Sequence, residues 1–278
     1  MNNKIAIITG GTSGIGKATA EKLVTFGTTV VFLARDVQKA ELVKKDILKT
    51  FPNGRIDIFE GDLKDLKSIK TAGEALKAKY PIIDILINNA GGVFSEFERT
   101  VDGFEVGFQV NHLGHFLLTQ ILLENLLKSP DSRIINLSSE AHRIGKFSVS
   151  NLNAEKKFST WKQYGATKLM NILFTKALAN KYGEQGLMSF AVHPGVVKSG
   201  FGANNSGFLK YFNKMPFLIT PEKGAETSIY LATQSKEKLS NGGYYKRCQI
   251  SYSSLESQDV VSQNQLWDIS MKMIKDYL

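Results

Sequence analysis

Short apolar runs alternate with longer amphipathic stretches along almost the whole chain. The short runs are rich in Ile, Val, Leu and Phe and predict buried strands. They lie at residues 5–9, 29–34, 56–60, 83–88, 133–137, 189–193 and 244–246. The longer stretches predict helices at about 14–26, 37–50, 65–79, 103–128, 161–183, 222–234 and 256–277.

Strands that alternate with helices are typical of βαβ units, in which helices cover both faces of a parallel sheet. Right-handed crossovers then produce a doubly wound sheet. We therefore predict an α/β protein with a single-domain Rossmann fold and a seven-stranded parallel sheet. Because no linker, repeat or low-complexity tract interrupts the pattern, residues 1–278 are expected to form one domain, with an extra C-terminal helix at about 256–277.

The least regular stretch, at about 199–220, is rich in aromatic and aliphatic residues. It follows a predicted strand, and ligand sites of α/β proteins lie at that end of the strands. We interpret it as an apolar lid over a substrate pocket. A packed or partner-facing segment is an alternative. A membrane-surface patch is another, because Lys210 and Lys214 stand among the aromatic residues.

Composition narrows the class of protein. The chain has 278 residues, a net charge of +9 and one cysteine, Cys248. One cysteine excludes an internal disulfide and favours a reducing, cytoplasmic setting. No apolar leader precedes the first strand, and no run approaches the ~20 apolar residues of a membrane span. The basic residues are spread along the chain, so we predict no nucleic-acid partner, while peripheral membrane contact stays open.

A glycine-rich turn follows the first predicted strand and opens the first predicted helix. Its glycines, Gly10, Gly14 and Gly16, have the spacing Gly-x-x-x-Gly-x-Gly, which differs from the Gly-x-Gly-x-x-Gly fingerprint. Glycines permit a tight turn and let phosphate approach the backbone N–H groups of a helix N-terminus. Thr12, Ser13 and Ile15 belong to the same predicted dinucleotide site.

Arg35 stands at the end of the second predicted strand, with Asp36 next to it. An acidic residue at this strand end would bond a ribose 2′-hydroxyl and favour NAD. Arg35 instead offers a planar donor fork to a 2′-phosphate. We therefore predict NADP (NADPH) as the cofactor. The alternative is that Arg35 is solvated and Asp36 contacts the ribose.

Tyr164 and Lys168 are four residues apart on a predicted helix and share one face of it. An ammonium near a phenol favours phenolate and can lower the phenol pKa by roughly one to three units from ~10. Together with a dinucleotide site, the pair indicates redox chemistry between carbonyls and alcohols.

Several motifs resemble the short-chain dehydrogenase/reductase family in its single-domain branch, most of all its retinol-dehydrogenase-like members. They are the glycine turn, Asn88-Asn89-Ala90-Gly91, Asn111-His112-Leu113-Gly114-His115, Asn136-Leu137-Ser138-Ser139, Tyr164-Gly165-Ala166-Thr167-Lys168, Asn171-Ile172-Leu173-Phe174-Thr175 and His193-Pro194-Gly195-Val196-Val197.

The resemblance implies a catalytic site of Asn111, Ser139, Tyr164 and Lys168. Tyr164 would exchange a proton with the substrate oxygen, and Ser139 rather than Ser138 would orient that oxygen. Lys168 would lower the Tyr164 pKa and bind the nicotinamide ribose, and Asn111 would hold a water that connects Lys168 to solvent.

The resemblance also implies contacts along the cofactor. Asp62 and Leu63 would lie near adenine. The following residues would line the rest of the cofactor: Asn89, Ala90, Gly91, Pro194, Gly195, Val197 and Ser199. Ser199 stands where the family has a Thr that bonds the carboxamide.

Other residues invite chemical interpretations. His112 and His115 lie on an apolar helix and are interpreted as core or interface residues, and Cys248 as packing. We predict no metal site. His142 is a lesser candidate for the substrate pocket. The long segment 142–161 is expected to form an extra loop in which Phe147, Phe158 and Trp161 wall that pocket.

The sequence therefore predicts an NADP-dependent oxidoreductase that interconverts a small lipophilic ketone or aldehyde and its alcohol. Reduction of a carbon–carbon double bond is one alternative, and a non-catalytic NADP-binding regulatory protein is another. Homo-oligomerisation stays open, since long apolar helices suit either a core or an interface.

Overall fold

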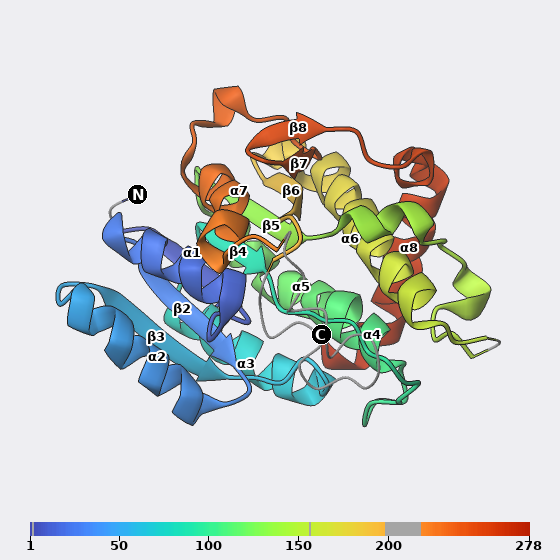
Figure 1. Ribbon diagram of the computed structural model, residues 1–278, viewed down its shortest axis with the longest axis horizontal. Coiled ribbons are helices and arrows are strands. Elements are labelled where there is room, and N and C mark those ends of the chain that lie inside the picture. Colours follow the sequence, from blue (N-terminus) through green and yellow to red (C-terminus); the bar gives the residue numbers. More distant parts are fainter. Residues whose placement is uncertain (2, 156, 198–217) are drawn as a thin grey trace.

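Helices flank both faces of one twisted sheet (Figure 1). The structure is a computed structural model that describes residues 1, 3–155, 157–197 and 218–278. Its strands are β1 (Ile5–Thr9), β2 (Thr29–Ala34), β3 (Arg55–Glu60), β4 (Ile85–Asn88), β5 (Arg133–Leu137), β6 (Met188–His193), β7 (Tyr244–Lys246) and β8 (Gln249–Ser251). Its α-helices are α1 (Gly14–Thr25), α2 (Val37–Thr50), α3 (Leu66–Lys79), α4 (Val106–Phe108), α5 (Gly114–Leu127), α6 (Thr160–Tyr182), α7 (Pro221–Thr233) and α8 (Val260–Ile274).

The sheet order is β3-β2-β1-β4-β5-β6-β7-β8, and β1 to β7 are parallel. The chain runs outward from β1 to β3 and then crosses back to β4 on the other side of β1. That reversal is the topological switch point, where the carboxyl ends of the strands open a crevice for ligands. The predicted α/β fold with a doubly wound sheet is confirmed.

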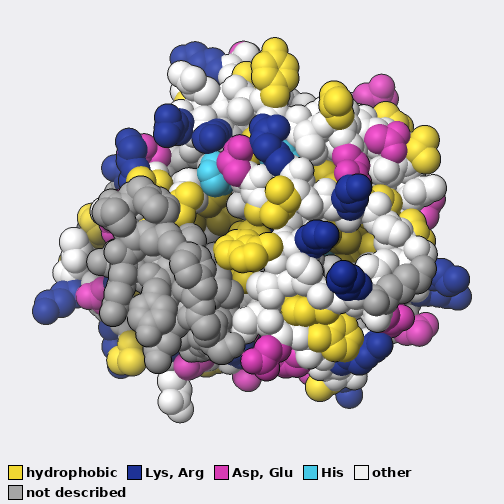
Figure 2. Space-filling view, turned by 45° about the vertical axis from the view of Figure 1, so that its right-hand side comes forward, with side chains coloured by type: hydrophobic (Ala, Val, Ile, Leu, Met, Phe, Trp, Pro, Cys, Tyr) yellow, Lys and Arg dark blue, Asp and Glu magenta, His cyan; other side chains and the backbone are white. Residues whose placement is uncertain are grey.

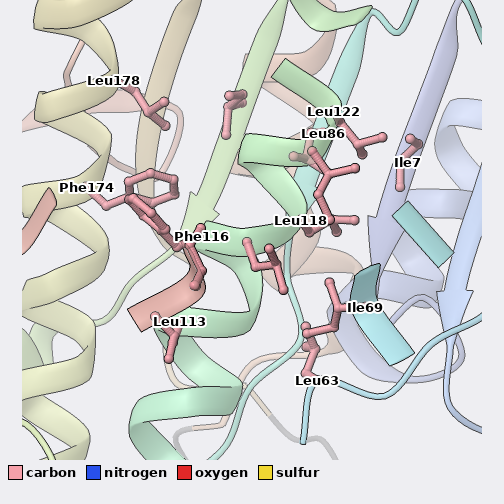
Figure 3. Close-up of a cluster of buried hydrophobic side chains, with 14 of the residues drawn as sticks. Ile7, Leu63, Ile69, Leu86, Leu113, Phe116, Leu118, Leu122, Phe174 and Leu178 are labelled. Carbon is pink, nitrogen blue, oxygen red and sulfur yellow. The ribbon is translucent and has the colours of Figure 1, made fainter. Parts of the chain in front are cut away.

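Two apolar cores lie on opposite faces of the sheet. One packs α3, α5, α6 and α8 against the sheet, and the other packs α1, α2 and α7. Figure 3 shows part of the first core, where Phe116 of α5 lies beside Phe174 of α6 and Leu118 of α5 lies near the sheet residue Leu86. The cores account for the short apolar strands, since both faces of each central strand are buried.

The sheet has an eighth strand that the sequence analysis did not predict. β8 pairs antiparallel with β7 through a two-residue turn at Arg247 and Cys248, whose φ angles are 52° and 60°. Tight hairpin turns of this kind usually carry Asn-Gly or Asp-Gly. Because neither residue is a usual turn former, the sequence gives no hairpin signal here, and the prediction of seven strands was wrong by one edge strand.

Two predicted helices have different bounds. Helical structure begins at Val106 rather than 103, because Gly103 lies in a turn at φ 82° and Glu105 accepts hydrogen bonds from the first helical N–H groups. A π-helical turn, Gln109–Leu113, then joins α4 to α5. Near the C-terminus, Asp259 caps α8 and separates it from a 3₁₀ turn at Leu255–Gln258. Within the described ranges, no helix is long and apolar enough to cross a membrane.

Candidate active site

A long cleft crosses the carboxyl ends of the central strands and brings most of the predicted site residues together. Those lining it are Gly10, Thr12, Ser13, Gly14, Ile15, Gly16, Arg35, Asp62, Leu63, Asn89, Ala90, Gly91, Ser139, Tyr164, Lys168, Pro194, Gly195 and Val197. Asn111 is buried behind the cleft wall, and Ser199 lies outside the described residues. Figure 2 shows the surface hollowed beside the grey residues, with hydrophobic side chains around the hollow.

The glycine-rich turn has positions that only glycine fits, and it lets a ligand approach the backbone closely. Gly10 has φ 66°, and a Cβ on Gly16 would lie 2.3 Å from the Gly10 carbonyl oxygen. At the same place α1 begins without a side-chain cap from Ser13 and without an acidic residue in its first turn. The first N–H groups of a helix need an acceptor, and an anion supplies one. This end of the cleft therefore suits a phosphate.

The end of β4 is fastened to the glycine-rich turn. The Thr9 hydroxyl accepts hydrogen bonds from the Asn89 and Ala90 N–H groups, both at 3.0 Å. The Asn89 amide in turn donates to the Thr9 and Gly10 carbonyls at 2.9 and 3.2 Å. These bonds join the two walls of the cleft.

At one end of the cleft, the segment that follows β2 presents basic groups. Arg35 is exposed and, among the described residues, has no ion-pair partner. The Asp36 carboxylate instead caps α2 by accepting from the Lys39 N–H at 2.8 Å. Lys39 also lines the cleft, and the sequence analysis missed it. The feature that could have indicated Lys39 is its position in the first turn of α2, beside the carboxyl ends of the strands.

Tyr164 and Lys168 lie in α6, and Ser139 directly follows β5. The Ser139 hydroxyl lies close enough to the Tyr164 hydroxyl to lower its pKa. The Lys168 ammonium donates to the Leu137 carbonyl at 3.1 Å and lies 5.6 Å from the centroid of the Tyr164 ring. Ser138 is turned away from this pair, since its hydroxyl donates to the Lys168 carbonyl at 2.7 Å.

Burial sets the protonation of both groups. It raises the pKa of Tyr164 to about 12, against a smaller opposite effect of the Ser139 hydrogen bond. It lowers the pKa of Lys168 to about 8, so the ammonium is still mostly charged at neutral pH. The sequence analysis predicted a lowered phenol pKa. That was wrong in direction because desolvation of the buried phenol raises its pKa, and the phenol therefore stays protonated at neutral pH.

Asn111 sits in the π-helical turn and uses both ends of its side chain. Its amide donates to the Gly92 carbonyl and the Thr167 hydroxyl, both at 3.0 Å, and its carbonyl accepts from the Gly92 N–H at 2.9 Å. A Cβ on Gly91 would lie 2.6 Å from the Asn111 carbonyl oxygen and 3.3 Å from the Lys168 ammonium. Asn111 therefore braces the cleft wall against the helix of Tyr164.

The three candidate histidines are buried and hydrogen-bonded within the protein. His112 and His115 are buried, hydrogen-bonded to Ser270 and Thr9, which confirms their assignment to the core. His142 does not line the cleft and is fully buried. Its ring bonds the Ser139 carbonyl at 2.6 Å and the Ser254 N–H at 3.1 Å.

The segment 142–161, which leads into α6, contributes only partly to the cleft. Trp161 lines it, whereas Phe147 packs against a core and Phe158 against Phe97. Two of the three aromatic residues predicted to wall the pocket thus have other partners. The predicted lid at 199–220 lies outside the described residues except for its last three, of which Ile219 lines the cleft.

A family model described as short chain dehydrogenase matches residues 4–207. The chain belongs to the short-chain dehydrogenase family. Retinol dehydrogenase 11 of Homo sapiens is 38% identical over 276 residues, which cover 99% of this chain and 86% of that protein. Retinol dehydrogenase 14 of Mus musculus is 35% identical over 289 residues, covering 99% and 86%.

Solved structures agree with the fold. A Mycobacterium paratuberculosis protein of uncharacterised function is 29% identical, with a TM-score of 0.79, and the match covers 99% of this chain and 94% of that one. Short-chain dehydrogenases are oxidoreductases that use a nicotinamide cofactor. The residues present fit such a cofactor, since a glycine wall and an uncapped helix N-terminus face the same cleft as Tyr164.

Proposed function

We propose that this short-chain dehydrogenase is an NADP(H)-dependent oxidoreductase that interconverts a lipophilic ketone or aldehyde and its alcohol. The observation that carries the proposal is the Tyr164–Ser139 hydroxyl pair, which lies in one cleft with the glycine-rich turn and beside the Lys168 ammonium. A proton donor, an orienting hydroxyl and a phosphate-binding turn in one cleft suit reduction of a carbonyl.

Each residue has a defined task in this proposal. When bound, the nicotinamide supplies the hydride that adds to the carbonyl carbon. Tyr164 gives its hydroxyl proton to the carbonyl oxygen, and Ser139 orients that oxygen by a hydrogen bond. The Lys168 ammonium stabilises the phenolate that Tyr164 leaves behind. Asn111 would hold a water through which the proton returns from solvent. In the oxidation direction the same proton moves from alcohol to phenolate.

The protonation states favour reduction at neutral pH. A phenol whose pKa is raised to about 12 carries its proton and is ready to donate it. Oxidation needs the phenolate, which this burial disfavours. The phenol is therefore in the state that the reduction step uses, whereas oxidation first requires it to lose its proton.

The side chains around the cleft indicate a lipophilic substrate. Trp161 and Val196 are 39% and 40% exposed although they are large and apolar, and both line the cleft. Their apolar neighbours in the lining include Val93, Phe94, Ala141 and Ile219. Apolar walls with few polar groups are typical of pockets for apolar small molecules.

The substrate class is tested with a panel of aliphatic aldehydes, aromatic ketones, sterols and retinoids, followed by NADPH consumption and product analysis. We expect alcohol products, with kcat/KM rising with substrate hydrophobicity. A product reduced at a carbon–carbon double bond would support the alternative reductase. Tight NADPH binding without turnover of any compound would contradict the proposal.

NADP preference is expected to depend on Arg35. Replacing it by Ser should lower kcat/KM for NADPH by about 10- to 100-fold, because a charged hydrogen bond to the 2′-phosphate is lost. The kcat/KM for NADH should not change. Arg55→Ser is the matched control. Arg55 begins β3, at the end of the strands opposite to Arg35, and donates hydrogen bonds to Asn3 and Gly27. Equal or better use of NADH by the wild type would refute the preference.

A further inference from the structure

The Glu105 carboxylate has an unusual environment in this protein. Among the described residues it is the one acidic side chain that is buried, with 0% exposure, and it has no ion-pair partner there. A buried carboxylate without a cation is costly unless several donors satisfy it. Other helices are capped from exposed positions, as by Asp36 and Asp259. Capping alone therefore does not account for burying a carboxylate here.

Three N–H donors hold the Glu105 carboxylate. One oxygen accepts from the Gly107 N–H at 2.8 Å, and the other accepts from the Phe108 N–H at 2.7 Å. The Gln163 side-chain amide donates to that second oxygen at 2.6 Å. Charge-assisted bonds of this length are strong and directional.

These partners belong to the two segments that carry the proposed catalytic residues. Gly107 and Phe108 begin the helical segment in which Asn111 lies, while Gln163 directly precedes Tyr164 in α6. The Gln163 amide also donates to the Leu152 carbonyl at 3.1 Å. One carboxylate thus ties the helix of Asn111 to the first turn of the helix of Tyr164.

The same groups surround one small cavity beside the cleft. Its lining includes Glu105, Asn111, Gln163 and Tyr164. Because Tyr164 directly follows Gln163 and lines the same cavity, a shift of the Glu105–Gln163 bond would move Tyr164. The proposed hydride and proton transfers do not involve Glu105 directly.

We propose that Glu105, acting through Gln163, is a positioning residue that fixes Tyr164 relative to Asn111 for proton transfer. The inference rests on the proposed function of Tyr164 as proton donor. In Glu105→Gln, the amide nitrogen must face either the Gly107 N–H or both the Phe108 N–H and the Gln163 amide, so at least one of the three bonds is lost without a change in side-chain volume.

The expected result is a fall in kcat of about tenfold or more, with the KM for substrate and the Kd for NADPH within about twofold of wild type. Misplacement of a reacting group by ~1 Å costs up to ~100-fold in rate, and an interaction needed only in the transition state affects kcat rather than KM. Gln163→Leu should have the same effect, since it removes the bridge and leaves the helix cap intact.

Asp259→Asn is the matched control, an acid-to-amide change at the exposed cap of α8, and should keep wild-type kcat. A folded Gln163→Leu variant with wild-type kcat would overturn the inference. If Glu105→Gln does not fold, Gln163→Leu decides alone.

A second readout needs no turnover and so separates this inference from the proposed function. The ¹³C NMR signal of the Tyr164 ring, assigned by its loss in Tyr164→Phe, should shift in Gln163→Leu and stay in place in Asp259→Asn. An unshifted Tyr164 signal in Gln163→Leu would refute the positioning role even if no substrate had been found.

Discussion

Tyr164→Phe is expected to lower kcat for carbonyl reduction by about 10²- to 10⁴-fold, the usual contribution of a positioned general acid. The change removes one hydroxyl and leaves the ring in its place against Val93 and 6.3 Å from the Trp161 ring. The glycine-rich turn and the uncapped end of α1 are untouched, so the Kd for NADPH should stay within about twofold. Single-turnover reduction and cofactor titration measure the two quantities separately.

Tyr245→Phe is a suitable control for this experiment. Tyr245 is buried, and its hydroxyl accepts from the Ser240 N–H at 2.7 Å, away from the cleft lining. It should retain full turnover even if the lost hydrogen bond lowers stability. Turnover by Tyr164→Phe within tenfold of the wild type would remove Tyr164 as the proton donor.

Lys168→Met is expected to combine loss of turnover with a gain in stability at neutral pH. Lys168 is 4% exposed, and its ammonium has a pKa of about 8 in the folded protein, against an ordinary value of 10.5. Keeping it charged in the core at pH 7 therefore costs about 3 kcal/mol. Met fills a similar volume without that charge, so the free energy of unfolding should rise by up to about this amount, less the lost bond to Leu137.

The gain should shrink as the pH rises. Between about pH 8 and 10.5 the unfolded chain binds more protons at this group than the folded protein does, so wild-type stability rises with pH across that window. Chemical unfolding at pH 7 and pH 9.5 should show the variant's advantage falling by roughly half. Lys162→Met, at an exposed position of α6, controls for the substitution. An advantage that is the same at both pH values would contradict the buried charge.

Much of the fold was readable because its strands are buried on both faces. Continuous apolar runs such as 30–34 then predict buried strands in an alternating pattern. The eighth strand was not readable, because its turn places Arg247 and Cys248 at positive φ without a turn-forming residue. The early start assigned to the helix before Asn111 has a similar cause, since the apolar pattern continues through a turn at Gly103.

The identity of the candidate site residues could be predicted from local motifs, and the cleft collects nearly all of them. The hydrogen-bond partners of these residues could not be predicted. His142 lies three residues after Ser139, yet its ring reaches both the Ser139 carbonyl and the Ser254 N–H, 112 positions away in the chain. Long-range bonds of this kind follow from packing between elements and leave no spacing to read in the sequence.

By itself the sequence determined the order of strands and helices and the residue types at the cleft, because periodicity and short motifs are local properties of the chain. Only the tertiary structure decided how the charges behave. The pKa of Tyr164 rises and that of Lys168 falls because α6 is packed into the core, where desolvation dominates. The role of Glu105 likewise appears only when α6 brings Gln163 to a carboxylate 58 residues earlier in the chain. Desolvation and long-range hydrogen bonding depend on which atoms surround a group, and the folded arrangement sets that.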